Sequence, residues 1–268
     1  MPNNQITSLH SPHVERVKAL LGSRGKKIRQ ADKEFIVDGI QSVRELLNPS
    51  FADAPKLINL YVTERGYIKL IEEISESVLQ DLPIIHVNDA VMNEMADTQS
   101  PQGILALCKF TQITLYKIKQ THPKKIAYFW EIQDPGNCGT VIRTAEALGF
   151  DAVIFSPNSV DVYSPKTVRA TVGAIWHIPI VQEIEIAELM DFANSEGFNT
   201  VAFAGDGVGS LLDLPRVDST ILIFGNEARG LPEISGLNSR VAIPMKGKSE
   251  SLNVASAAAI AMFEIGIR

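Results

Sequence analysis

An arginine, a glutamate and two asparagines stand in or beside loops of small residues, a setting that suits the binding of a polar ligand. Asn137 lies in the stretch QDPGNCG, and Arg143 follows near the start of a predicted helix. Glu227 lies in GNEARGLP, and Asn253 follows a polar loop near the C-terminus. Because an arginine keeps its proton at ordinary pH, Arg143 suits the stabilisation of a phosphate or a developing oxyanion better than the role of general base. An exposed helix arginine without any role gives the same pattern.

Two short apolar runs must position these loops. Residues 221–224 (ILIF) read as a strand buried on both faces, and the run stops at Gly225, where a glycine allows an unusual backbone angle or the close approach of a ligand. A second run, 241–244, ends in another polar loop. Two strand ends that feed small-residue loops predict a binding crevice at the carboxyl edge of a parallel sheet.

The first half of the chain alternates between strand and helix patterns. Helices are expected near 11–21, 40–47 and 67–79 and from 88, and strands at 34–38, 57–62, 83–87 and 103–110. This alternation predicts a small α/β domain over residues 1–111. Residues 112–125 carry few large apolar side chains and are broken by His122-Pro123, so we expect them to be a linker.

A second α/β domain is expected over residues 126–268. Strands are predicted at 126–130, 152–155, 177–181, 200–203, 221–224 and 241–244, and helices from 140, at 164–174, at 184–195 and from 254 to the end. In the helix from Thr140, Arg143 falls on the side opposite the apolar stripe, so it should face away from the core.

Three motifs, in order along the chain, resemble those of the SpoU (TrmH-type) RNA 2'-O-ribose methyltransferases of the SPOUT superfamily. They are NCGTVIR from Asn137, GNEARGLP from Gly225, and IPMKGKSESLNVASAAAIA from Ile243. The resemblance covers the C-terminal half closely and the N-terminal half more loosely, as the ribosomal-protein-like RNA-binding domain that such enzymes carry. It implies a C-terminal parallel sheet with a deep trefoil knot, and a homodimer.

The resemblance also assigns the site. It implies that S-adenosylmethionine lies against Gly225, Ile243 and Leu252, although core packing explains the last two equally well. The catalytic residues that it implies are Arg143, Asn137, Glu227, Ser251 and Asn253. Of these, Ser251 also suits a helix cap.

A basic segment near the N-terminus is the predicted RNA contact. Residues 16–33 hold seven positive side chains against one acid, and we expect phosphate contacts from Arg24, Lys26, Lys27 and Arg29. A solvated helix face and loop is the plainer interpretation of such a charge run. The net charge of −6 resides in the second half of the chain, so it does not oppose RNA binding by the first.

Composition narrows the remaining choices. No apolar run reaches the length of a membrane span, no signal-peptide pattern is present, and two cysteines form neither a disulfide framework nor a metal site, so a cytoplasmic protein with reduced thiols and no metal is expected.

Ribosomal RNA is the favoured substrate, with transfer RNA as an alternative. A catalytically silent RNA-binding factor is disfavoured by the full set of motif residues. A nucleotide-dependent oxidoreductase is disfavoured because GDGVG at 205–209 lacks the dinucleotide-loop spacing.

Overall fold

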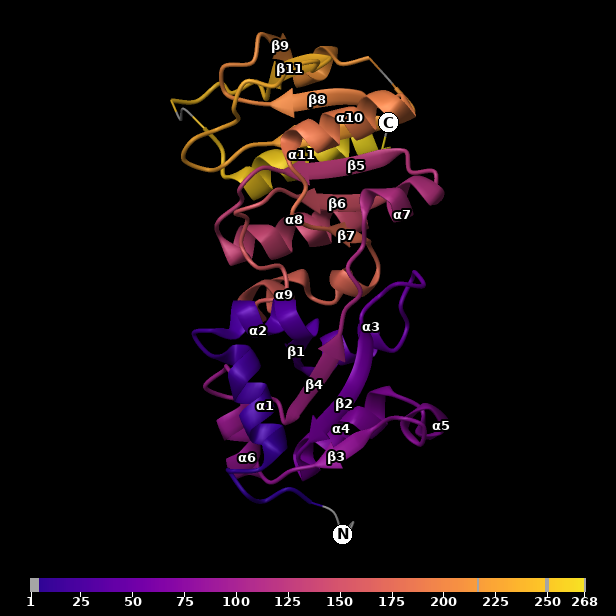
Figure 1. Cartoon of the computed structure of the whole chain (residues 1–268), viewed down its shortest axis with the longest axis vertical. Coiled ribbons are helices and arrows are strands. Elements are labelled where there is room, and N and C mark those ends of the chain that lie inside the picture. Colours follow the sequence, from indigo (N-terminus) through magenta and orange to yellow (C-terminus); the bar gives the residue numbers. More distant parts are fainter. Residues whose placement is uncertain (1–4, 216, 249–250, 268) are drawn as a thin grey trace. The chain divides into compact units, whose positions relative to one another are not determined.

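The protein divides into two compact α/β units (Figure 1), seen in a computed structural model that describes residues 5–215, 217–248 and 251–267. The first unit comprises Met1–Thr111 and Asp161–Trp176. The second comprises Gln112–Val160 and His177–Arg268. A segment from the second half of the chain therefore belongs to the N-terminal unit.

The first unit is built on a four-stranded sheet of order β1-β4-β2-β3, in which β4 runs antiparallel to β1 and β2 while β2 and β3 are parallel. Its strands are β1 (Glu34–Asp38), β2 (Lys56–Val62), β3 (Ile84–His86) and β4 (Ile104–Lys109). Its helices are α1 (Pro12–Leu21), α2 (Gly25–Asp32), α3 (Ile40–Leu46), α4 (Glu64–Glu73), α5 (Glu76–Leu79), α6 (Asp89–Met95) and α9 (Pro165–Thr171), with a 3-10 turn η1 (Ala174–Trp176).

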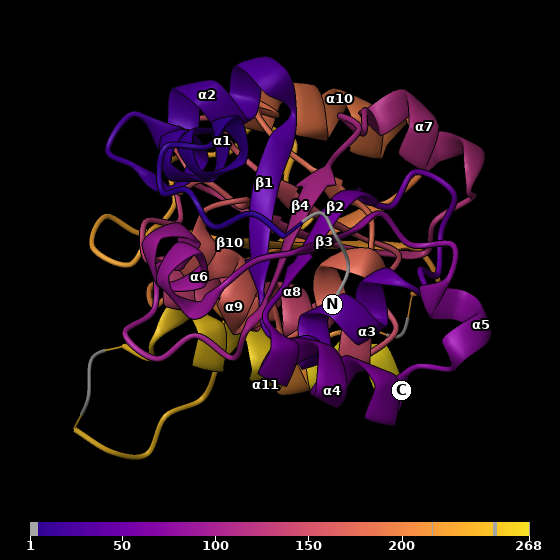
Figure 2. The same ribbon diagram turned by 90° about the horizontal axis from the view of Figure 1, so that it is seen from below.

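Helix α1 shows how the first core forms. Ser11 caps it, Pro12 occupies its first turn, and its apolar stripe is fully buried against α6 and one face of the sheet. Figure 2 shows α1 and α6 side by side. Because successive strand residues point to opposite faces, Ile36 joins this core while Phe35 packs against Tyr163 and Trp176 on the other face.

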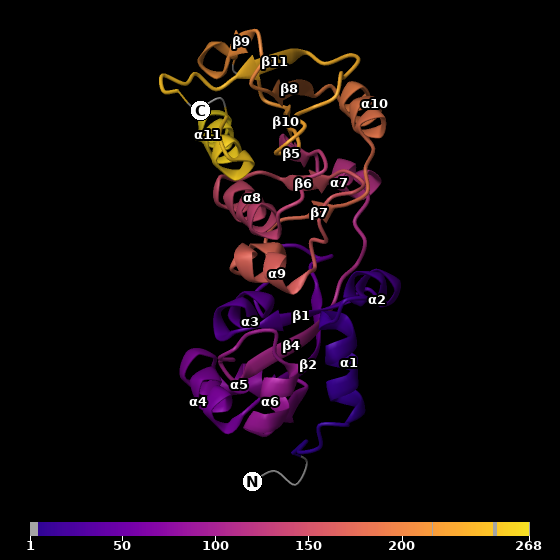
Figure 3. The ribbon, with the colours of Figure 1, turned by 90° about the vertical axis from the view of Figure 1, so that its left-hand side faces the viewer.

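The second unit holds a seven-stranded sheet whose paired strands are all parallel, in the order β7-β6-β5-β10-β8-β11-β9. Its strands are β5 (Lys125–Phe129), β6 (Ala152–Phe155), β7 (Ile180–Val181), β8 (Asn199–Phe203), β9 (Gly209–Ser210), β10 (Thr220–Phe224) and β11 (Ser239–Ala242). Its helices are α7 (Leu115–Gln120), α8 (Pro135–Ala147), α10 (Ile186–Glu196) and α11 (Val254–Ile267), with a 3-10 turn η2 (Leu211–Asp213). In Figure 3, α8 and α11 lie together on one face of the sheet, and α7 and α10 on the other.

Strand β10 lies at the centre of this sheet. All five of its residues are buried, as predicted for an apolar run covered on both faces, and it pairs with β5 and β8 along its whole length. Four phenylalanines, the last residues of β6, β5, β10 and β8, stack in a row across the strands: Phe155, Phe129, Phe224 and Phe203. These strands therefore end at the same level, on one edge of the sheet.

Three predictions about segments need correction. Helix α8 begins at Pro135 and not at Thr140, because Asp134 caps it by accepting from the Asn137 amide (2.8 Å). Helix α2 begins at Gly25 in the basic segment, where no helix of its own was predicted. The predicted linker contains α7, which begins after a Thr114 cap and buries Leu115 and Ile118.

Candidate functional site

A cavity of about 480 Å³ opens where the parallel strands of the second unit end, at what we call the carboxyl edge. Phe203 and Phe224 form part of its wall. The remaining wall comes from Ala204 and Gly205 after β8, residues 225–230, which we call the GNEARG loop, residues 242–245 at the end of β11, and residues 251–257 at the start of α11. All three predicted cofactor residues, Gly225, Ile243 and Leu252, line this cavity, as do Glu227 and Ser251.

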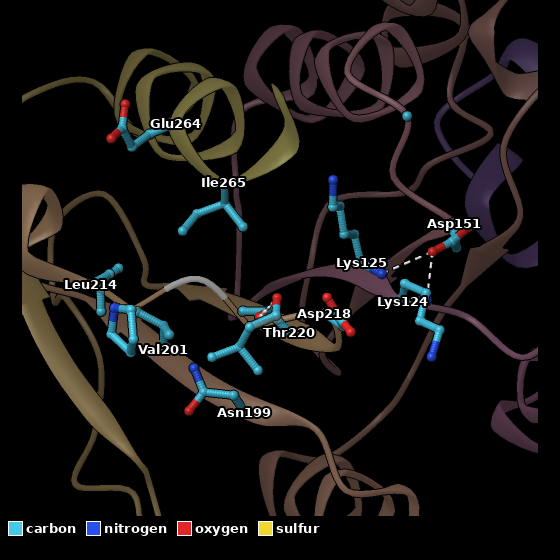
Figure 4. A pocket seen from close by; sticks show the side chains of 13 residues that line it. Lys124, Lys125, Asp151, Asn199, Val201, Leu214, Asp218, Thr220, Glu264 and Ile265 are labelled. Atoms are coloured by element: carbon cyan, nitrogen blue, oxygen red, sulfur yellow. Dashed lines mark hydrogen bonds between the residues drawn. The ribbon is translucent and has the colours of Figure 1, made fainter. Parts of the chain in front are cut away.

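A second cavity, of about 530 Å³, lies at the opposite or amino edge of the same sheet (Figure 4). The Asp151 carboxylate accepts hydrogen bonds there from the backbone amides of Lys124 and Lys125 (2.7 and 2.8 Å), and the Lys125 amine donates to the Gly266 carbonyl (2.6 Å). These polar groups hold strand and helix ends in place. Ligands of parallel α/β sheets bind at the carboxyl ends of strands. The cavity at the carboxyl edge is therefore the candidate site, although it is the smaller of the two.

A chain of hydrogen bonds joins the three motif segments beside the cavity. Asn137 Nδ2 donates to Glu227 Oε1 (3.1 Å), and Asn253 Nδ2 donates to Asn137 Oδ1 (3.0 Å). Asn253 Oδ1 in turn accepts from the first amides of α11, those of Ala255 and Ser256 (2.9 and 3.3 Å). The orientation of both asparagine amides is thereby fixed, since each oxygen and each NH₂ group faces the partner that it requires. The helix cap predicted for Ser251 is provided by Asn253 instead.

The GNEARG loop itself requires a residue without a side chain at position 225. An added Cβ there would lie 2.5 to 2.8 Å from backbone atoms of Gly230 and Leu231. The left-handed residue of the loop is Gly230, at φ 66°, and not Gly225. A side chain at Gly225 would push the cavity wall out of place.

Asn226 holds the GNEARG loop, and sequence reasoning missed it. Its side chain is 6% exposed; Nδ2 donates to the Glu131 carbonyl (2.7 Å), and Oδ1 accepts from the amides of Ala228 and Arg229 (2.9 and 3.0 Å). A reciprocal backbone pair with Gly230 closes the loop. The signal available was an asparagine, a residue that favours turns, directly after a strand-ending glycine.

Arg143 lies on the exposed side of α8, as predicted, with Val141 and Ala145 buried on the other. It is six residues beyond Asn137, which corresponds to roughly 9 Å along the helix axis. Within the described part of the chain it makes no hydrogen bond or ion pair, and Glu227 contacts Asn137 and not Arg143. The structure thus joins Asn137, Glu227 and Asn253 and leaves the Arg143 guanidinium available to a ligand.

The predicted RNA contacts separate into two kinds. Arg24, Lys26 and Lys27 are exposed. Arg29 is only 6% exposed, and its guanidinium pairs with Asp161 (2.7 Å) and donates to the Leu20 carbonyl. The prediction that Arg29 contacts phosphate does not fit this placement, because its charge is already paired inside the first unit.

Three further observations concern the described residues. In the ranges that the structure covers, no cluster of three or more His, Cys, Asp or Glu side chains is arranged to hold a metal ion. None of the helices in these ranges combines the length and apolarity that a membrane crossing requires. Burial raises the pKa of the Cys108 thiol well above its ordinary value, which makes this thiol a poor nucleophile.

Both halves of the chain are similar to known protein families. Residues 124–263 match the SpoU rRNA Methylase family, and residues 14–106 match the MRM3-like substrate binding domain. The chain is 29% identical over 264 residues to the Bacillus subtilis 23S rRNA (guanosine(2553)-2'-O)-methyltransferase RlmP, covering 97% of this chain and 99% of that protein. It is also 29% identical to the 23S rRNA (uridine(2479)-2'-O)-methyltransferase of Streptomyces viridochromogenes, covering 97% and 91%. Among solved structures, an AdoMet-bound rRNA methyltransferase from Sinorhizobium meliloti superposes with a TM-score of 0.81 at 27% identity, covering 97% and 96%.

Proposed function

Because the chain belongs to the SpoU rRNA methylase family, we propose that it transfers a methyl group from S-adenosylmethionine to a ribose 2'-hydroxyl of ribosomal RNA. The observation that carries this proposal is the hydrogen-bonded chain Glu227–Asn137–Asn253 beside the carboxyl-edge cavity. It brings one polar residue from each of the three motifs to one place. The names of the two relatives, both 23S rRNA 2'-O-methyltransferases, support ribosomal RNA as the substrate class.

The carboxyl-edge cavity suits the proposed methyl donor. Its volume of about 480 Å³ falls in the range of small-molecule sites, and it combines apolar walls with the polar backbone of the loops that line it. Phe224, Ile243 and Leu252 offer apolar surface to an adenosine. S-adenosylmethionine supplies a methyl group on a sulfonium, so its leaving group needs no further activation. The task of the protein is to align the reacting atoms and to manage the charge on the ribose oxygen.

The motif residues divide this task. Asn137 and Asn253 fix the relative positions of α8, the GNEARG loop and the start of α11. Glu227 uses one carboxylate oxygen for Asn137, and the other can accept a hydrogen bond from the substrate. Arg143 stabilises the oxyanion that develops on the ribose, and the proton passes to water or to a phosphate oxygen. Ser251, on the cavity wall, is a further polar group that can orient the substrate.

A direct test uses labelled S-adenosylmethionine and total RNA from a strain that lacks the gene, with ribosomal and transfer RNA separated afterwards. We expect one ribose to become labelled, and mapping by primer extension or mass spectrometry identifies it. Ribosomal RNA from the parent strain, already modified, serves as the control and should accept little label. Label on transfer RNA alone, or on no RNA, would contradict the proposal.

We propose further that residues 1–111 act as the RNA substrate-binding domain, with exposed Arg24, Lys26 and Lys27 as phosphate contacts. Replacing Lys26 and Lys27 with glutamine should weaken RNA binding and reduce the slope of log K against log salt by roughly one unit per lost contact. Lys56→Gln with Lys109→Gln, two exposed lysines on strands of the same unit, is the matched control. If the two double variants give equal salt slopes, Lys26 and Lys27 do not contact phosphate, and α2 is only a solvated surface.

The assembly and location that we propose follow the family resemblance: a trefoil-knotted homodimer in the cytoplasm, where ribosomal RNA resides. Helix α11 supports a dimer, since Ile260 and Phe263 expose 43% and 57% of their surface. Sedimentation equilibrium should give twice the monomer mass of 29.3 kDa. A monomer at micromolar concentration would remove the dimer from the proposal.

A further inference from the structure

Glu131, two residues beyond β5, has a backbone conformation that its residue type disfavours. Its φ is 49°, in the left-handed region, where the backbone of a residue with a side chain is strained. Three hydrogen bonds hold it there. Its amide donates to Ser156 Oγ (2.7 Å), and its carbonyl accepts from Asn226 Nδ2 (2.7 Å) and Gln133 Nε2 (3.0 Å).

The side chain of Glu131 reaches the same loop as its carbonyl does. Its carboxylate, 14% exposed, forms an ion pair with the Arg229 guanidinium. That guanidinium also lies over the Trp130 ring, 5.4 Å from its centre. Glu131 therefore binds the GNEARG loop at two points, Asn226 and Arg229, one on each side of Glu227.

Two residues outside the GNEARG loop, Asn137 and Glu131, hold it in place. Asn226, Glu227 and Arg229 all line the candidate cavity. Glu227 is held from one direction by Asn137, while its neighbours are held from another by Glu131. A loop that is fixed before the ligand arrives loses less conformational entropy on binding. These contacts should therefore increase the affinity of the cavity for its ligand.

We infer that Glu131 is a positioning residue for methyl transfer, which holds the GNEARG loop closed around the methyl-donor cavity through its left-handed carbonyl and its ion pair with Arg229. The inference rests on the proposed function for the identity of the ligand. It predicts that the ion pair contributes to cofactor affinity more than to folding.

Substitutions at Glu131 can separate the effect of its backbone strain from the effect of its carboxylate. Glycine accepts a positive φ without strain, so Glu131→Gly should fold at least as stably as the parent chain while losing the ion pair. Glu131→Gln removes the charge and keeps the shape. Glu131→Asp keeps the charge on a shorter side chain that tolerates a left-handed backbone, and it should restore part of the affinity.

The experiment is calorimetry of S-adenosylmethionine binding to each variant, with thermal melting alongside. We expect Glu131→Gly and Glu131→Gln to weaken binding about fivefold, a size set by a partly exposed ion pair. The affinity of the parent chain should fall with added salt toward that of Glu131→Gln, whose affinity should change little with salt. In turnover assays, KM for the cofactor should rise while kcat stays within about twofold.

The matched control is Glu196→Gln, which breaks the Lys119–Glu196 ion pair elsewhere in the second unit and should leave cofactor affinity unchanged. Parent-like affinity of both Glu131→Gly and Glu131→Gln would overturn the inference. A parent chain that gives no binding heat with S-adenosylmethionine would instead overturn the proposed function, so the two failures are distinguishable.

Discussion

The two edges of the parallel sheet in the second unit carry cavities of similar size but use their polar residues differently. At the amino edge, the side chains of Asp151 and Lys125 form hydrogen bonds with backbone groups and hold the ends of strands and helices in place. At the carboxyl edge, Asn226 and Asn253 also bond backbone groups, but Glu227, Asn137 and Asn253 in addition contact one another by their side chains. An interaction between two side chains leaves further polar atoms for a ligand, whereas one that satisfies the backbone serves the fold. The use of polar groups, and not volume, therefore identifies the site.

The largest effect should come from Arg143 near the carboxyl edge. Arg143→Ala should lower the single-turnover methylation rate by roughly 10²-fold or more, the scale for the loss of one preorganised donor. Since the side chain is exposed, stability should change by no more than about 0.5 kcal/mol. Arg143→Lys should restore little activity, because a point charge cannot replace the planar guanidinium. Near-normal turnover of Arg143→Ala at saturating RNA would remove the catalytic role.

A tenfold or greater loss of cofactor affinity is expected for Gly225→Ala, because the new Cβ would collide with the backbone of Gly230. Gly247→Ala is the matched control, since a Cβ there meets no described atom within 4 Å. Calorimetry with S-adenosylmethionine measures both. If Gly225→Ala binds as tightly as Gly247→Ala, the GNEARG loop is not a wall of the cofactor site.

Asn253 allows its two hydrogen-bonding roles to be separated. Aspartate keeps the acceptor that caps α11 but cannot donate to Asn137, so Asn253→Asp should melt like the parent chain and methylate roughly tenfold more slowly. Asn253→Ala should in addition lose about 1 kcal/mol of stability with the cap. Equal rates for the parent chain and Asn253→Asp would show that the contact with Asn137 is dispensable.

The smallest functional effect should occur at the amino edge. Asp151→Ala removes the acceptor for two backbone amides and should lower the free energy of unfolding by about 1 kcal/mol. Cofactor affinity should remain that of the parent chain, and Asp151→Asn, which keeps an acceptor, should recover most of the stability. A clear loss of affinity in Asp151→Ala would break the distinction between the two edges.

Much of the fold was predictable from local patterns. Strands β1 and β6 were predicted with the bounds observed, and the buried β10 followed from its apolar run. Gly225, Ile243 and Leu252 were grouped by resemblance to a family, and the structure places all three on one cavity wall. Periodicity alone identified the strands but could not have grouped residues from separate loops.

The parts that sequence analysis missed depend on distant partners. Arg29 resembles any other basic residue of its segment, and its burial is decided by Asp161, 132 positions further along. The left-handed backbone of Glu131 has no local signal, because Ser156 and Asn226 impose it. The start of α8 does have a local signal, because Asp134-Pro135 is a recognised helix start. Two glycines, Gly136 and Gly139, lie in the first turns of the helix and obscure that signal.

The assignment of Asp161–Trp176 to the first unit means that the chain passes between the two units three times, after residues 111, 160 and 176. A fragment that ends at residue 111 would lack Tyr163 and Trp176, two of the three aromatic partners of Phe35, and the carboxylate that neutralises Arg29. The N-terminal unit is therefore not an exchangeable cassette. Recombination that exchanges the first unit would have to replace residues 161–176 together with residues 1–111.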